Sequence, residues 1–480
     1  GGDAVIVRKI ADKSWSVTPK DVQWVDAAEG LPRGDWDAIQ ALRRDEPELA
    51  SFLAMRGEEV HVVAGWPLED KVTWIHRCLE RLRVPWEDGH TSLTLHRHSA
   101  LAEACDRFLE LPARAFRQIF RFDFLDELAI DAGGVAREFF TLVTEELFSS
   151  ELLVDGMHLF TGTESHSTTY QFQPCPERPS EEVLRYLRFA GRFLAKGLFD
   201  GHTTAAHLAR PLYRHLLGLP TNMTHLEDYD SQLYQQLVWL RDLPHGSEDL
   251  TSSLGLDFTV SYPQSGEHEF RTAELCPRGG QRELTEQNRA EYVALRYRRR
   301  ALLDIQVQLT AFLDGFYDVI PRALLLPFAC EDFERILCGL PSIDVDDWRA
   351  NCRYAGSFRP QRGVLGVLRE PKIVRWFWEV VQGLSQTQRG RLLRFVTGSA
   401  GVPIGGFKML LGTDGKICPF TLEPVKRGTS GAEGMASLPR AHTCFNRLDL
   451  PAMYESKEEL RKVLVTVIDT DLAITGFDME

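Results

Sequence analysis

Apolar residues recur at helical spacing through most of the chain after residue 66. The segment PLEDKVTWIHRCLERLRV begins at Pro67 and continues with acidic residues, which is typical of a helix N-terminus. A short strand is expected at SLTLHRHS (92–99), followed by a helix over LAEACDRFLELPARAFRQIF (101–120). The first 65 residues are mixed, with VIVRKI as a possible short strand and a helical pattern over 36–55.

The same reasoning predicts mixed helices and strands in the rest of the chain. Two helices are expected over 306–340, broken at Pro321 and Pro327, because proline cannot continue a helix. The C-terminal part has fewer helices and several strand-like segments. Further helices are predicted at 185–201, 231–243, 345–354 and 373–384. The three segments 406–412, 438–451 and 462–468 are together expected to supply strands and a last helix. Polar loops are expected at 357–372 and 422–437. The fold class is therefore α+β.

The composition indicates a globular protein of more than one domain. The chain has 480 residues, of which 44% are hydrophobic and 26% are charged. A net charge of −14 argues against a general nucleic-acid binder, which would carry a basic surface. The sequence contains no apolar run approaching the roughly 18 residues that a membrane span needs.

Nine cysteines are scattered along the chain, and none forms a CxxC pair. This pattern argues against a disulfide framework and against a zinc module. We expect no metal or organic cofactor.

One cysteine stands out because of its neighbours. Cys444 lies in LPRAHTCFNRLDLP (438–451), with His442 and Asn446 two residues to either side. In an extended strand these three side chains would share one face. A thiol is only a few per cent ionised near neutral pH, so a nucleophilic cysteine benefits from such neighbours. Many single cysteines are instead small buried hydrophobes, and local chemistry leaves both interpretations open.

The segment LPRAHTCFNRLDLP closely resembles the active-site segment of HECT-type ubiquitin ligases. Three other segments resemble that family: DAGGVARE (131–138), RYLRFAGRFLAKGLFDG (185–201) and TGSAGVP (397–403). The resemblance covers about 66–480. It implies a bilobal HECT fold, with a larger, mostly helical N-lobe and a smaller α/β C-lobe joined by a flexible hinge. The implied boundaries are an N-terminal extension of unknown role (1–65), the N-lobe (66–338, with a conjugating-enzyme-binding subdomain at 229–297), the hinge (339–342) and the C-lobe (343–480).

The resemblance also implies roles for particular residues. Cys444 would accept ubiquitin as a thioester, and Phe477, four residues from the end, would serve the transfer to lysine. From their spacing, His442 is a candidate for proton handling and Asn446 for an oxyanion donor. Leu233 and Leu237 share one helix face, and with Leu243 and Tyr292 they would line the groove for the conjugating enzyme, although an ordinary core role is the alternative. Gly339 and Pro341 would form the hinge.

The expected partners are ubiquitin, a ubiquitin-conjugating enzyme and protein substrates, with no nucleic acid and no membrane span. We expect the protein to be intracellular, in the cytoplasm or the nucleus. The chain opens with Gly-Gly and no Met, so we expect that it begins inside a longer protein or after a removed tag. Two alternative functions remain: a cysteine hydrolase acting on ubiquitin conjugates, and a HECT-shaped binding module without catalysis.

Overall fold

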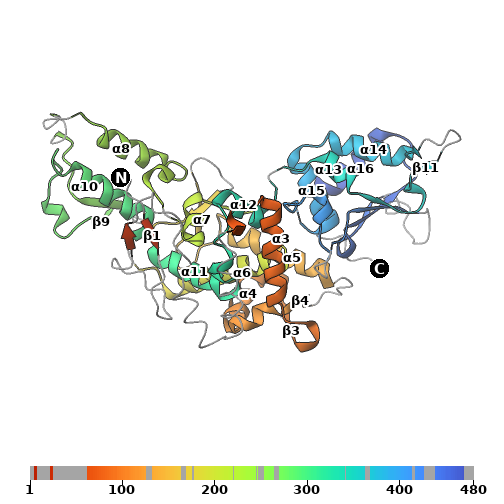
Figure 1. Ribbon diagram of the computed structural model, residues 1–480, viewed down its shortest axis with the longest axis horizontal. Helices are drawn as coiled ribbons and strands as arrows, with labels where there is room; N and C mark the ends of the chain where they lie inside the picture. Colours follow the sequence, from red (N-terminus) through yellow and green to blue (C-terminus); the bar gives the residue numbers. More distant parts are fainter. Residues whose placement is uncertain are drawn as a thin grey trace. The chain divides into compact units, whose positions relative to one another are not determined.

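The computed structural model describes residues 5–7, 22–24, 62–125, 132–163, 169–175, 178–219, 221–244, 246, 253–263, 270–340, 342–362, 368–399, 401–412, 417–425 and 438–469. The chain forms two compact units (Figure 1). The first contains 1–66, 147–193 and 206–330, and the second contains 67–146, 194–205 and 331–480. This division differs from the predicted lobes, because 67–146 groups with 331–480.

The first unit is mostly helical. Its helices are the first part of α6 (Glu181–Asp200), α7 (Arg210–Leu217), α8 (Ser231–Arg241), α10 (Arg289–Arg298) and α11 (Gln306–Val319). Three small sheets are described in this unit. One is made of β5 (Phe160–Gly162), β6 (Thr169–Phe172) and β7 (His207–Leu208), and one of β8 (Thr259–Pro263) and β9 (Phe270–Glu274). The third pairs β1 (Val5–Val7), inside the segment expected to hold a short strand, with β2 (Val22–Trp24).

Helices α6 and α11 touch backbone to backbone where two glycines meet the opposite helix. A Cβ on Gly191 would lie 2.0 Å from the Phe312 carbonyl oxygen, and one on Gly315 would lie 1.9 Å from the Arg188 carbonyl oxygen. No side chain fits at either position, so glycine is required for this close crossing. Arg192 also pairs with Asp318 of α11 at 2.6 Å, which adds an electrostatic contact beside the crossing.

The second unit begins with a βαβ arrangement. Helix α3 (Leu68–Leu82) precedes β3 (His90–Leu95), which pairs in parallel with β4 (Ile119–Phe124) across the connecting helix α4 (Ala100–Glu110). The predicted helix over 101–120 was wrong in its second half. Leu111 is extended and Pro112 follows it, so the helix ends there, and Ile119 and Phe120 belong to a strand. Helix α5 (Ala132–Leu147) follows, with Gly133 and Gly134 in its first turn.

The C-terminal part of this unit has a sheet covered by helices. The strand order is β10 (Arg353–Tyr354), β13 (Thr421–Val425), β15 (Arg447–Pro451), β14 (Arg440–His442), and only β14 is antiparallel to its neighbour. The helices that pack on it are α13 (Val345–Ala350), α14 (Lys372–Gln382), α15 (Gln386–Thr397) and α16 (Lys457–Asp469). Helix α12 (Cys330–Cys338) precedes them in the chain, and its Asp332 pairs with Lys71 of α3 at 3.0 Å. A short hairpin pairs β11 (Gln361–Arg362) with β12 (Leu368–Arg369).

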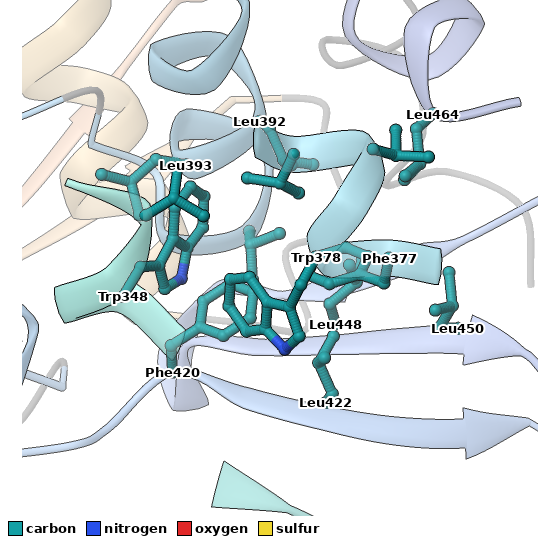
Figure 2. Close-up of a cluster of buried hydrophobic side chains, with 14 of the residues drawn as sticks. Trp348, Phe377, Trp378, Leu392, Leu393, Phe420, Leu422, Leu448, Leu450 and Leu464 are labelled. Carbon is teal, nitrogen blue, oxygen red and sulfur yellow. The ribbon is translucent and has the colours of Figure 1, made fainter. Parts of the chain in front are cut away.

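A single hydrophobic core supports this sheet, and all of its residues lie between Ile343 and Ile468 (Figure 2). Trp348 stacks on Phe407 with ring centroids 4.8 Å apart, and its ring edge meets Phe420. Leu422, Leu448 and Leu450 bring the two central strands into the same core. Two predictions were wrong here: Leu422–Val425 is a central strand and no loop, and 406–412 contains a 3-10 turn, Phe407–Met409, where a strand was expected.

Among the described residues, no helix is both long and apolar enough to cross a membrane.

Candidate active site around Cys444

Cys444 lies in the turn of a tight β-hairpin. The hairpin pairs β14 with β15 in the register Arg440↔Asp449, Ala441↔Leu448 and His442↔Arg447. The four residues between the strands form a 3-10 turn, Thr443–Phe445, and then Asn446 in the left-handed region at φ 48°. The predicted continuous strand through His442, Cys444 and Asn446 was therefore wrong, and the three residues do not alternate along one strand face.

Asn446 has a structural reason to be at this position. Asparagine tolerates the left-handed region better than most residues, and here it ends the 3-10 turn. Its side chain is fully buried, and its amide nitrogen donates to the carbonyl oxygens of Leu411 at 3.0 Å and Cys418 at 2.6 Å. Both amide hydrogens are thus engaged. The arrangement favours a role in holding the turn over the predicted oxyanion role, which would require one of these bonds to break.

The polar outer face of the hairpin carries His442. Its Nε2 lies 2.9 Å from Asp449 Oδ2, and the imidazole is about half-exposed. Arg447 lies 3.0 Å from the other oxygen of Asp449 and 3.1 Å from Glu423 of the adjacent strand. A carboxylate at Nε2 fixes the tautomer in which Nε2 carries the hydrogen, so Nδ1 is left to accept a proton. Sequence reasoning missed Asp449. Its position was a signal, because Leu448 and Leu450 on either side of it point into the core and side chains alternate along a strand.

One other residue of the turn, Phe445, is exposed, whereas Thr443 is buried. The Phe445 side chain is 64% exposed, so the turn presents an aromatic ring to solvent next to Cys444, the candidate nucleophile. Cys418 approaches from the β13 side, with its Sγ 3.3 Å from the Phe445 carbonyl oxygen. Among the described residues no group of three or more His, Cys, Asp or Glu side chains is arranged to hold a metal ion.

The residues predicted to line the partner groove are mostly buried in this chain. Leu233 and Tyr292 are buried, Leu237 is only 2% exposed, and Leu243 is half-buried. This burial is compatible with the core alternative, and a docking role for these residues stays a prediction. The exposed apolar side chain of α8 is Trp239, which is 49% exposed and which sequence reasoning did not single out.

The predicted hinge begins where α12 ends. Gly339 has φ 83°, and its N–H donates to the Arg335 carbonyl at 2.8 Å. A Cβ at this position would lie 2.8 Å from the Val402 carbonyl oxygen. The glycine therefore has a local structural reason as a helix C-cap, independent of motion. Pro341 and Phe477 lie outside the described residues, and the hinge stays a prediction.

Comparison with known proteins gives the family. The family model described as "HECT-domain (ubiquitin-transferase)" matches residues 141–480, which is more than half of the chain. This chain belongs to the HECT-domain family. Cys444, its hairpin and the core beneath it all lie inside the matched region. The match begins within α5, whereas the resemblance seen in the sequence begins at about residue 66.

Two relatives show how much of a HECT protein the chain represents. It is 33% identical over 356 residues to the E3 ubiquitin-protein ligase Nedd-4 of Drosophila melanogaster, covering 74% of this chain and 32% of the relative. It is also 33% identical over 359 residues to the E3 ubiquitin-protein ligase TOM1-like of Neurospora crassa, covering 74% of this chain and 8% of that protein. The chain thus spans a third or less of the length of these relatives.

Proposed function

We propose that this chain is a ubiquitin-protein ligase that receives ubiquitin as a thioester on Cys444 and passes it to substrate lysines. The observation that carries the proposal is the position of Cys444 in the turn of a hairpin inside the region matched by the HECT family model. The relatives named as E3 ubiquitin-protein ligases support it.

The first step exchanges one thioester for another. The Cys444 thiolate attacks the carbonyl that joins ubiquitin to the conjugating enzyme, and the conjugating enzyme leaves as a thiolate. The bonds broken and formed are of the same kind, so the step depends on positioning more than on driving force. A nucleophile on a short turn held by buried hydrogen bonds suits this requirement.

The second step forms an amide. A substrate lysine amine attacks the Cys444 thioester, loses a proton, and releases the Cys444 thiolate. A base near the turn would assist this proton loss. His442, with Asp449 on its Nε2, is the candidate, because its Nδ1 is free to accept the proton. Phe477 stays a prediction for this step.

The conjugating enzyme would dock on the 229–297 subdomain. The buried state of Leu233, Leu237 and Tyr292 favours the face of α8 that carries Trp239 over a groove lined by those three. A small exposed apolar surface suits a weak and transient encounter. We further propose an intracellular location, because the conjugation reaction requires these partners there.

The test is adduct formation with activating enzyme, conjugating enzyme and labelled ubiquitin, analysed with and without reducing agent. We expect a thiol-sensitive adduct that Cys444→Ala abolishes, and a more stable oxyester in Cys444→Ser. Cys175→Ala is the matched control, because Cys175 is half-buried and belongs to the other unit.

A thiol-sensitive adduct that persists undiminished in Cys444→Ala would contradict the assignment. Cleavage of ubiquitin chains would instead indicate the hydrolase, and neither activity would indicate the binding module.

A further inference from the structure

A polar stripe on α5 faces the elements that surround Cys444. Arg137, Thr141 and Glu145 are spaced by four residues and so lie on one face of the helix. All three contact the C-terminal end of α15. Arg137 Nη1 donates to the Thr397 carbonyl, Thr141 Oγ1 lies 3.5 Å from the Gly398 carbonyl oxygen, and Glu145 pairs with Arg394 at 2.6 Å.

Arg137 extends from this stripe to the turn itself. Its Nη1 donates to the Thr443 carbonyl at 2.7 Å and to Asn446 Oδ1 at 3.0 Å, and its Nη2 donates to the Leu411 carbonyl at 2.5 Å. The Thr443 carbonyl belongs to the peptide bond whose nitrogen is that of Cys444. One guanidinium therefore joins both ends of the turn that carries the nucleophile.

The surroundings are shaped for this side chain. Arg137 is buried, and the planar guanidinium can donate to several acceptors in a fixed geometry. Gly398, at φ 75°, ends α15 beside it, and a Cβ there would lie 2.9 Å from the Cβ of Arg137. A larger residue at 398 would displace the arginine. The carbonyls at a helix C-terminus also carry partial negative charge, which favours a cation at Thr397.

We infer that Arg137 is a positioning residue for the transfer reaction: its guanidinium fixes the Thr443–Asn446 turn and thereby the backbone of Cys444. The inference rests on the proposed function only in taking Cys444 as the nucleophile. The exposed Glu145–Arg394 pair at the other end of the stripe contributes little, so the buried hydrogen bonds of Arg137 are the main link between α5 and the turn. Such a link can hold the turn in one geometry during transfer.

The first measurement needs no ubiquitin. Hydrogen exchange of the 440–448 peptide is compared in wild type, Arg137→Met and Arg137→Lys. We expect protection to fall by at least about tenfold in Arg137→Met, because the turn loses two of its hydrogen bonds. Lysine keeps the charge but lacks the planar guanidinium with its several donors, so the protection in Arg137→Lys should be intermediate between wild type and Arg137→Met. The matched control is Arg97→Met, which removes an arginine that binds Glu138, the next residue of α5, at 2.6 Å.

The second measurement is single-turnover loading of Cys444 at increasing concentrations of ubiquitin-charged conjugating enzyme. The maximal rate should fall by at least about tenfold in Arg137→Met, because small displacements of a nucleophile are costly. The half-saturating concentration should stay within about twofold of wild type, because docking occurs elsewhere. The pH midpoint of Cys444 alkylation, followed on the Cys444 peptide, should rise when the nearby cation is removed and return in Arg137→Lys.

Unchanged exchange in both variants would overturn the inference, and so would lost protection with an unchanged maximal loading rate. If Arg137→Met fails to fold, Arg137→Lys decides through the same hydrogen exchange, loading rate and alkylation midpoint. If wild-type Cys444 forms no ubiquitin adduct at all, the proposed function fails, while exchange and alkylation still decide whether Arg137 holds the turn.

Discussion

At the scale of single residues, environment decides roles that residue type leaves open. Asn446 was a candidate oxyanion donor by its spacing from Cys444, but its left-handed backbone and buried amide make it part of the support of the turn. Leu237 was a candidate docking residue by its helix face, but it is buried. A charged substitution at Leu237 would therefore damage the core, and lost transfer in that variant would say nothing about docking.

His215 illustrates how burial changes the chemistry of a side chain. It lies in α7, is 2% exposed, and burial lowers its pKa to about 4 from an ordinary value of 6.5. Between these two pH values the unfolded chain binds a proton that the folded chain does not. Stability is therefore fully present above pH 6.5 and is lost as the pH falls toward 4.

We predict that His215→Phe removes this pH dependence. Between pH 7 and pH 5 the wild-type free energy of unfolding should fall by about 2 kcal/mol more than that of the variant. Urea unfolding at several pH values measures the difference. His98→Gln, at an exposed histidine, is the control and should follow wild type. Parallel pH profiles for wild type and His215→Phe would show that His215 is not buried as a neutral group.

At the scale of elements, periodicity found the helices well and their ends less well. Predicted helices at 185–201 and 231–243 correspond to α6 and α8. The break at Leu111–Pro112 was missed because apolar residues on both sides kept helical spacing. Which helices cross closely could not be predicted at all, because Gly191 and Gly315 acquire their meaning only when α6 meets α11.

We predict that Gly315→Ala destabilises the first unit by about 3 kcal/mol or more, because the new methyl group would collide with the Arg188 carbonyl. Hydrogen exchange of the α6 and α11 amides measures this change. Gly383→Ala is the matched control: Gly383 has φ −84°, and its Cβ would make only ordinary contacts, the nearest at 3.5 Å. Equal protection in the two variants would mean that the helices do not approach so closely.

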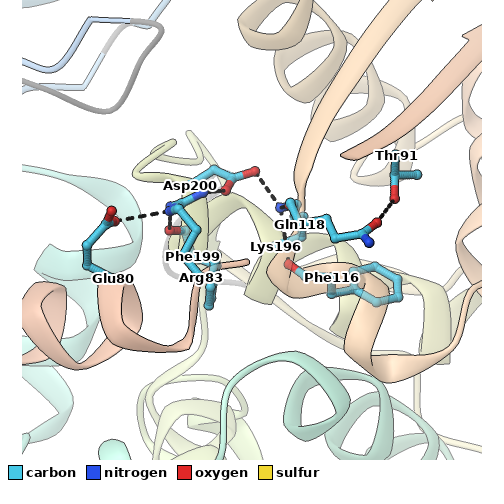
Figure 3. A network of polar contacts seen from close by, with 8 residues as sticks. All are labelled: Glu80, Arg83, Thr91, Phe116, Gln118, Lys196, Phe199 and Asp200. Carbon is cyan, nitrogen blue, oxygen red and sulfur yellow. Dashed lines mark hydrogen bonds and ion pairs between the residues drawn. The ribbon is translucent and has the colours of Figure 1, made fainter. Parts of the chain in front are cut away.

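At the scale of the whole molecule, a buried polar network joins segments that are far apart in the sequence (Figure 3). Lys196 is fully buried, pairs with Asp200 at 2.8 Å, and donates to the carbonyl oxygens of Phe116 and Gln118. Arg83, after α3, pairs with the same Asp200 at 3.0 Å. Burial lowers the pKa of Lys196, and Asp200 opposes that shift. The network thus ties α3, β4 and the end of α6 within the second unit.

Lys196→Met should lower the free energy of unfolding by about 3 kcal/mol. The carbonyl oxygens of Phe116 and Gln118 would lose their donor, and the Asp200 carboxylate would lose one of its two cationic partners. Combining it with Asp200→Asn should cost less than the sum of the two single changes. Arg178→Met removes an exposed pair with Glu181 and should cost less than about 1 kcal/mol. Exchange of the α3 and α6 amides reports each change, and strict additivity would mean that Lys196 and Asp200 do not interact.

The sequence by itself determined the α+β class, the HECT family and the identity of the candidate nucleophile. These follow from local periodicity and from a motif that is contiguous in the chain, so they can be read without coordinates. Tertiary structure alone decided that Cys444 sits on a hairpin turn, that Asp449 faces His442, and that Arg137 reaches the turn from more than 300 residues away. The Arg137 contact depends on which distant segments pack together, and the turn depends on hydrogen bonds from Asn446 to Leu411 and Cys418, so neither can be read from the segment around Cys444 alone.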